Sequence, residues 1–187
     1  MRVDRERGLL EGARLCPSPN CDPRPLGTEI DLVVVHGISL PPGQFGGPWI
    51  DALFTNTLDP QAHGYFSDIC HLRVSAHLLI TRAGEIVQYV PFHMRAWHAG
   101  PSCFAGRMAC NDFSIGIELE GADDVPYTEV QYTVLAAAIR ALMAAYPGIT
   151  PERIVGHCDI APGRKTDPGP AFQWARLREL LQRATEV

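Results

Sequence analysis

The stretch LVVVHG, residues 32–37, decides the fold class of this 187-residue chain. A continuous run of apolar, β-branched side chains is typical of a strand that is buried on both faces in the middle of a sheet. His36 directly follows this run, and a glycine follows the histidine. We therefore expect a central strand over Leu32–Val35 that carries His36 at its carboxyl end.

Four further segments are predicted to be strands that can pair with this one. Residues 74–80 and 85–90 flank the tripeptide Arg82-Ala83-Gly84, and this pattern predicts a β-hairpin. From Phe113 to Leu119, large apolar side chains alternate with small or polar ones. One face of that strand is therefore core, and the other presents Glu118 next to a glycine. A short strand is also expected at residues 154–155, directly before His157.

Helices are predicted between these strands in the sequence and after the last of them. Thr128 and Gln131 form a capping box in front of apolar residues that recur at helical spacing until Pro147 and Gly148. Residues 49–54 predict a short helix, and residues 172–181 predict a closing one. The expected fold class is α/β: a single domain with a central mixed β-sheet flanked by helices. Residues 1–28, which are rich in proline, are expected to form an extended N-terminal arm, and residues 29–183 the core.

Composition and charge exclude several classes of partner. The chain has 16 Lys and Arg against 21 Asp and Glu, and it has no basic stripe, so we expect no nucleic acid partner. The most apolar stretch, residues 135–146, is too short to cross a membrane and is interrupted by Arg140. The first twelve residues mix acids with bases and contain no apolar run, so we expect a cytoplasmic protein with six free cysteine thiols.

Residues that suit a metal site occur in two separate motifs. Two neutral histidines and one carboxylate leave the fourth position of a tetrahedral metal open, as in catalytic sites. His36, His157 and Asp167 are candidates for such a set. Because Asp167 precedes a proline, its segment should be extended, which places Lys165 and Asp167 on one face. The residues alone leave alternatives open: each of these side chains can be purely structural, five other histidines compete as ligands, and Cys16 with Cys21 can hold a structural metal.

Five segments of the chain resemble a known family of proteins. The segments that carry the resemblance are HGISLPPGQFGGPWID (36–51), HLRVSAHLLITRAGEIVQYVPF (71–92), RAWHAG (95–100), CNDFSIGIELEG (110–121) and GHCDIAPGRKTDPGP (156–170). In this order they are similar to the cytoplasmic 1,6-anhydro-N-acetylmuramoyl-L-alanine amidases of the AmpD type, over about residues 15–174. The resemblance implies one amidase domain over residues 1–187, with Zn2+ in a surface groove.

The resemblance also implies a reaction and roles for five residues. His36, His157 and Asp167 would be the zinc ligands, and Glu118 and Lys165 the catalytic residues. The reaction would be hydrolysis of the amide between the lactyl group of the anhydro sugar and L-alanine, in peptidoglycan recycling. Loss of this activity would then affect β-lactamase induction. This chain departs from the family at Gly37, where asparagine is usual, and the departure concerns how the substrate peptide is held.

Substrate contacts are predicted from residue type alone. Trp97 can stack on a sugar, His98 can hydrogen-bond it, and Arg73 can bind a peptide carboxylate through two hydrogen bonds. Each also has a simpler interpretation, because tryptophan is a good core residue and exposed arginine is usually solvated. Two other functions remain open: a recognition module that binds peptidoglycan fragments without cutting them, and an amidase that acts on intact peptidoglycan. We expect a small-molecule muropeptide as substrate, no membrane partner and a monomer.

Overall fold

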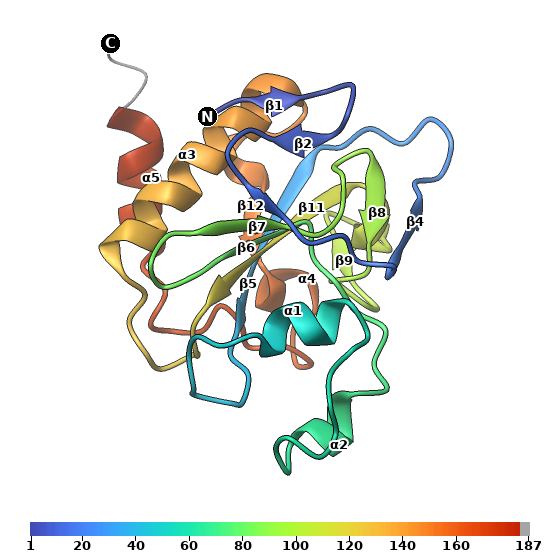
Figure 1. Ribbon diagram of the computed structural model, residues 1–187. Coiled ribbons are helices and arrows are strands. Elements are labelled where there is room, and N and C mark those ends of the chain that lie inside the picture. The colour runs from blue at the N-terminus through green and yellow to red at the C-terminus, as the bar shows by residue number, and fades with distance from the viewer. Residues whose placement is uncertain (184–187) are drawn as a thin grey trace.

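A six-stranded mixed sheet forms the centre of the fold in the computed structural model, which describes residues 1–183 (Figure 1). Its strands lie in the order β12-β5-β11-β6-β7-β3. The first four are parallel to one another, β7 is antiparallel to β6, and β3 is parallel to β7. The strands are β5 (Leu32–Ile38), β6 (Leu78–Ile80), β7 (Ile86–Gln88), β11 (Ser114–Glu120), β12 (Ile154–Gly156) and β3 (Arg14–Leu15). The predicted mixed sheet is thereby confirmed.

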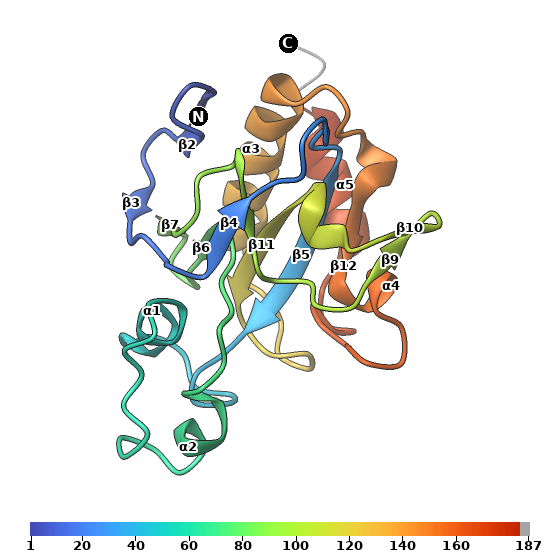
Figure 2. The ribbon, with the colours of Figure 1, turned by 90° about the vertical axis from the view of Figure 1, so that its right-hand side faces the viewer.

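Helices cover both faces of this sheet. The long helix α3 (Glu129–Ala145) and α5 (Trp174–Gln182) lie together on one face (Figures 1 and 2). The short helices α1 (Trp49–Phe54), α2 (Phe66–Ile69) and α4 (His157–Ile160) lie on the other. None of the helices in residues 1–183 is long and apolar enough to cross a membrane.

The alternation of side chains along β5 divides the core between the two faces. Val33 and Val35 pack under α3 and α5 with the apolar residues of β11. Leu32 and Val34 point the other way, toward Ile160 of α4. His36 continues the second series, so it faces the side that carries α4. The strand is buried on both faces up to His36, as the apolar run predicts.

The capping box and the hairpin also form as predicted. The backbone N–H of Gln131 donates to Thr128 Oγ1 at 3.2 Å, and the backbone N–H of Thr128 donates to Gln131 Oε1 at 3.0 Å. The hairpin pairs β6 with β7 antiparallel, with Leu79 opposite Val87. Each hairpin strand spans three residues and is therefore shorter than the apolar pattern.

The N-terminal arm lies on the body of the protein and pairs with it. Strands β1 (Val3–Asp4) and β2 (Leu9–Leu10) form a small hairpin, and β3 lies at the edge of the main sheet. Strand β4 (Cys21–Pro23) pairs with β8 (Met94–Ala96). A second small hairpin, β9 (Cys103–Phe104) with β10 (Arg107–Met108), leads into the short 3-10 helix η1 (Cys110–Asp112) (Figure 2). Another 3-10 helix, η2 (Pro151–Arg153), precedes β12.

Candidate metal centre and active-site groove

Three neighbouring parallel strands bring the predicted site residues to one edge of the sheet. In the parallel pair β5 and β11, His36 lies opposite Glu118. On the other side of β5, Gly156 at the end of β12 lies opposite Val35, and His157 follows immediately as the first residue of α4. The carboxyl ends of parallel strands are where α/β sheets place their ligands. The topology therefore places His157, His36 and Glu118 in a row.

Three electron-rich atoms converge at this edge. The Nδ1 atoms of His36 and His157 lie 2.9 Å apart. Oδ2 of Asp167 lies 3.0 Å from Nδ1 of His157 and 3.3 Å from Nδ1 of His36. Atoms with lone pairs that point at a common centre need a positive charge among them, either a proton or a metal cation. These three residues are the candidate metal site among the described residues, and Cys16 and Cys21 form no such group there.

In both histidines the outer ring nitrogen, Nε2, which points away from this centre, also has a hydrogen-bond partner. Nε2 of His157 lies 3.2 Å from the backbone carbonyl of Ala99, which can only accept, so this nitrogen carries a proton and its Nδ1 faces the centre. Nε2 of His36 lies 2.9 Å from Nδ1 of His98. Burial lowers the pKa of His36 to about 4, so its ring is neutral above that pH and can bind a metal ion.

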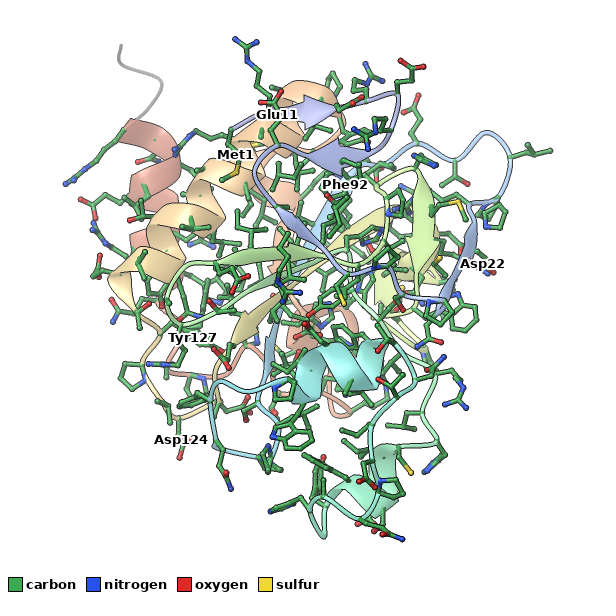
Figure 3. The ribbon with its side chains drawn as sticks, in the orientation of Figure 1. Met1, Glu11, Asp22, Phe92, Asp124 and Tyr127 are labelled. Atoms are coloured by element: carbon green, nitrogen blue, oxygen red, sulfur yellow. The ribbon has the colours of Figure 1, made fainter. Side chains whose placement is uncertain are left out.

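The segment that carries Asp167 is held from two sides. The backbone N–H of Cys158 donates to the carbonyl of Asp167 at 3.0 Å. The Tyr127 hydroxyl donates to the carbonyl of Pro168, also at 3.0 Å. In the side-chain view Tyr127 lies near the carboxyl end of β11 (Figure 3). A Cβ atom at Gly37 would overlap the Tyr127 hydroxyl oxygen, so the absence of a side chain at residue 37 makes room for this contact.

Glu118 is buried, with one unpartnered oxygen. The side chain is only 8% exposed, and Oε2 has no hydrogen-bond partner. Burial raises the pKa of Glu118 well above 4.5; the nearby Asp167 carboxylate adds to this effect, and Lys165 opposes it. A carboxyl group with a raised pKa beside a metal site is suited to carry a proton during catalysis.

A groove of about 440 Å3 joins these groups. Its lining includes all five residues for which the resemblance implies a role in zinc binding or catalysis, and also His98: His36, His98, Glu118, His157, Lys165 and Asp167. A larger, mainly apolar cavity of about 650 Å3 lies between α3 and α5, with Met143, Trp174 and Leu177 in its lining. That cavity contains none of the metal or proton-carrying groups, so the smaller groove is the candidate active site.

Two of the predicted substrate contacts lie outside the groove lining. Arg73 stands between the lining residues Leu72 and Val74, but its guanidinium donates to backbone carbonyls at the end of α2, including that of Leu72 at 3.3 Å. Trp97 Nε1 donates to Asp22 Oδ1 at 3.0 Å, and Asp22 lies on β4, away from Tyr127 (Figure 3). Substrate binding by Arg73 and Trp97 stays a prediction.

Glu120 is a residue whose role the alternating pattern did not identify. It lies two residues beyond Glu118 on the same face of β11 and is 6% exposed. One carboxylate oxygen accepts from the backbone N–H of Gly46, and the other accepts from that of Arg82 at 3.0 Å. Glu120 therefore ties the loop that follows β5, which lines the groove through Pro42 and Gly43, to the β6–β7 hairpin.

Comparisons with known proteins show what the whole chain is similar to. Residues 26–170 match the model of the N-acetylmuramoyl-L-alanine amidase family. A 1,6-anhydro-N-acetylmuramyl-L-alanine amidase AmpD of Escherichia coli is 65% identical over 180 residues, which cover 96% of this chain and 98% of the relative. A crystal structure of an AmpD derivative superposes with a TM-score of 0.93 at 62% identity, over 97% of this chain and 99% of that one.

A more distant structure contains a substrate. It is the N-acetylmuramyl-L-alanine amidase AmiD of E. coli in complex with anhydro-N-acetylmuramic acid-L-Ala-D-γ-Glu-L-Lys. The TM-score is 0.58 at 30% identity, over 84% of this chain and 60% of that one.

Proposed function

This chain belongs to the N-acetylmuramoyl-L-alanine amidase family, and on that premise we propose how its groove performs the family's reaction. The protein is a 1,6-anhydro-N-acetylmuramyl-L-alanine amidase of peptidoglycan recycling. It hydrolyses the amide that joins the lactyl group of the anhydro sugar to L-alanine. The observation that carries the proposed mechanism is the convergence of His36, His157 and Asp167 beside the unpartnered oxygen of Glu118.

We propose that the three converging residues hold zinc. Donor atoms bound to one tetrahedral zinc ion at about 2.0–2.1 Å lie about 3.3 Å from one another. The separations of 2.9, 3.0 and 3.3 Å fit this requirement after a small expansion. Imidazole nitrogen and carboxylate oxygen are also the donors that zinc accepts. Bound there, zinc supplies a lowered pKa for water and polarises the scissile carbonyl.

Glu118 is the proposed proton carrier. Its buried Oε2 takes the proton of the attacking water as the water oxygen bonds to the lactyl carbonyl carbon. When the carbon–nitrogen bond breaks, the same carboxyl group delivers that proton to the nitrogen of L-alanine. The products are a carboxylic acid on the sugar, which retains the second proton of the water until it ionises, and a free amine on the peptide. The raised pKa of Glu118 suits both halves of this cycle.

Lys165 is the proposed stabiliser of negative charge. Its side chain reaches the same groove, two residues before Asp167. While the carbonyl carbon is tetrahedral, its oxygen carries negative charge, and an ammonium group beside it lowers the energy of that state. Arg73 and Trp97 remain the proposed contacts for the sugar and peptide. The third predicted contact, His98, lines the groove, but both of its ring nitrogens are already engaged, by His36 and by Ser114.

Three further proposals concern the working protein. Residues 1–187 act as one amidase domain, and the monomer is sufficient because all five proposed zinc-binding and catalytic residues come from one chain. The protein acts in the cytoplasm. All six cysteines carry free thiols, which suits a reducing compartment. The partner is a small muropeptide.

The test uses two substrates in one tube. Zinc-loaded protein receives equal amounts of anhydro-muramoyl tripeptide and its non-anhydro counterpart, and mass spectrometry follows both. We expect free tripeptide from the anhydro sugar alone. Equal cleavage of both would indicate an amidase of intact peptidoglycan instead. Cleavage of neither, by protein that holds one zinc per chain, would favour a recognition module.

A further inference from the structure

One backbone segment contacts the outer nitrogens of both proposed histidine ligands. Nε2 of His36 lies 2.9 Å from the His98 side chain, and Nε2 of His157 lies 3.2 Å from the carbonyl of Ala99. His98 and Ala99 are adjacent in the chain, although His36 and His157 are 121 residues apart. When a histidine binds a metal through one nitrogen, the partner of the other nitrogen sets the tautomer and the ring orientation. The His98–Ala99 segment therefore controls both rings at once.

A single side chain holds this segment in place. Oδ1 of Asn111, in the 3-10 helix η1, accepts hydrogen bonds from the backbone N–H groups of His98 at 3.1 Å and Ala99 at 2.8 Å. Two consecutive N–H groups that share one acceptor fix the peptide unit between them. The two hydrogen bonds therefore hold the backbone on both sides of the His98 side chain, and the Ala99 carbonyl belongs to the next peptide unit along the chain. Arg164 donates to that same carbonyl at 2.6 Å, from the segment that precedes Lys165.

Two residues of strand β11, Ser114 and Gly116, contact the His98 ring and hold it in place. The ring nitrogen Nε2 lies 3.1 Å from the hydroxyl of Ser114, which is fully buried. The ring itself lies directly over Gly116, where a Cβ atom would come within 2.6 Å of Nδ1. Ser114, Gly116 and Glu118 share one face of β11, so this face supports the His98 ring and presents the proton carrier.

We propose that Asn111 is a positioning residue of the metal centre: its side-chain carbonyl fixes the His98–Ala99 segment, which orients His36 and His157 for binding the metal. This inference rests on the proposed zinc site. Asn111 is not a lining residue of the groove and touches neither ligand directly. It acts through the two hydrogen bonds that it accepts.

The first experiment measures metal affinity and not only turnover. In Asn111→Leu the acceptor is lost at nearly constant volume, and we expect zinc affinity, measured by competition with a chelating dye, to fall about 10- to 100-fold. The visible absorption bands of bound Co2+ should shift, because the two imidazoles are no longer held in one geometry. Asn111→Asp retains an acceptor oxygen and should keep zinc affinity within a few-fold of the unaltered protein.

A matched control tests for general loosening of the same region. Ser102 Oγ accepts from the backbone N–H of Cys110, next to Asn111, and donates to the carbonyl of Gly100 at 3.0 Å, so its hydrogen bonds go to neither His98 nor Ala99. Ser102→Ala should therefore leave zinc affinity and the Co2+ spectrum unchanged. If Asn111→Leu binds zinc as tightly as the unaltered protein and gives the same Co2+ spectrum, the inference is wrong. If the unaltered protein itself binds no zinc, the proposed function fails first.

A second measurement needs no variant. In the zinc-loaded protein, 15N NMR of the histidine rings should find His36 and His157 both protonated at Nε2, with slow exchange of those protons. Binding of either ring to zinc through Nε2 would overturn the arrangement, even if Asn111→Leu does not fold.

Discussion

The Tyr127 hydroxyl occupies the space that a side chain at residue 37 would need. Replacing Gly37 by alanine places a methyl group on the Tyr127 hydroxyl oxygen, whereas the next ring atom, Cζ, is 3.7 Å away, at ordinary contact distance. Overpacking of this kind costs about 1–3 kcal/mol. A Gly→Ala change at a residue with an ordinary backbone conformation returns about 0.4–1 kcal/mol through the unfolded state. We expect Gly37→Ala to lower the free energy of unfolding by about 1–2 kcal/mol.

The same change should have the opposite sign when the hydroxyl is absent. In Tyr127→Phe the overlap disappears, so Gly37→Ala should be neutral or stabilising by up to about 1 kcal/mol. The hydrogen bond to Pro168 is already lost in that background, so its cost cancels in the double-mutant cycle. The coupling energy between the two residues is then about 1–3 kcal/mol.

Urea unfolding of the metal-free protein at pH 7 measures all four members of this cycle. Equal slopes against urea concentration are required for the comparison. If Gly37→Ala costs the same in both backgrounds, to within about 0.5 kcal/mol, the packing argument is refuted. Zinc affinity gives a second readout, because displacement of Tyr127 loosens the segment that carries Asp167. Zinc affinity should fall in Gly37→Ala, and also in Tyr127→Phe, which lacks the hydrogen bond to Pro168.

Three further predictions concern charge and metal. Glu118→Gln should retain one zinc per chain and lower the turnover number about 10²- to 10⁴-fold, and wild-type turnover would contradict this. The same change should raise the melting temperature at pH 7, because burial disfavours the charged form of Glu118. His157→Ala should lose zinc on dialysis, and stoichiometric zinc by metal analysis would count against the ligand set. The pKa of His36 is about 4 in the folded protein and 6.5 in an unfolded chain. Between these pH values the unfolded chain binds more protons at this histidine than the folded protein does. Acidification should therefore lower the unfolding free energy of the metal-free protein, with about 3 kcal/mol of that loss due to His36. Equal urea midpoints at pH 7 and pH 4.5 would contradict this prediction.

Features that depend on neighbouring residues were predictable from the sequence. The apolar, β-branched run before His36 favours a buried strand on local grounds alone. The capping box at Thr128 likewise marks the start of a helix without information about distant residues. The alternation around Glu118 likewise assigns its face within one strand. The limits of the hairpin strands were less predictable, because pairing and not the apolar pattern ends them.

Features that depend on distant partners were not predictable in this way. Nothing near Asn111 in the sequence indicates that it would bind the backbone beside His98. No local pattern marks Tyr127, which directly precedes the helix cap Thr128, and its contact with Pro168 spans 41 residues. Pairing of β4 with β8 is equally remote from any local pattern. Such contacts follow from the topology, which brings together side chains that are distant in the sequence.

The register of β5 against β11 has a consequence for how this family tolerates insertions and deletions. His36 and Glu118 lie opposite each other, and each is the next residue on its face after a buried series. Removing one residue within either strand would turn every later side chain to the opposite face, which would send a histidine or a glutamate into the apolar layer under α3. Length changes among homologues should therefore be confined to the loops, and the two strands should keep a constant length.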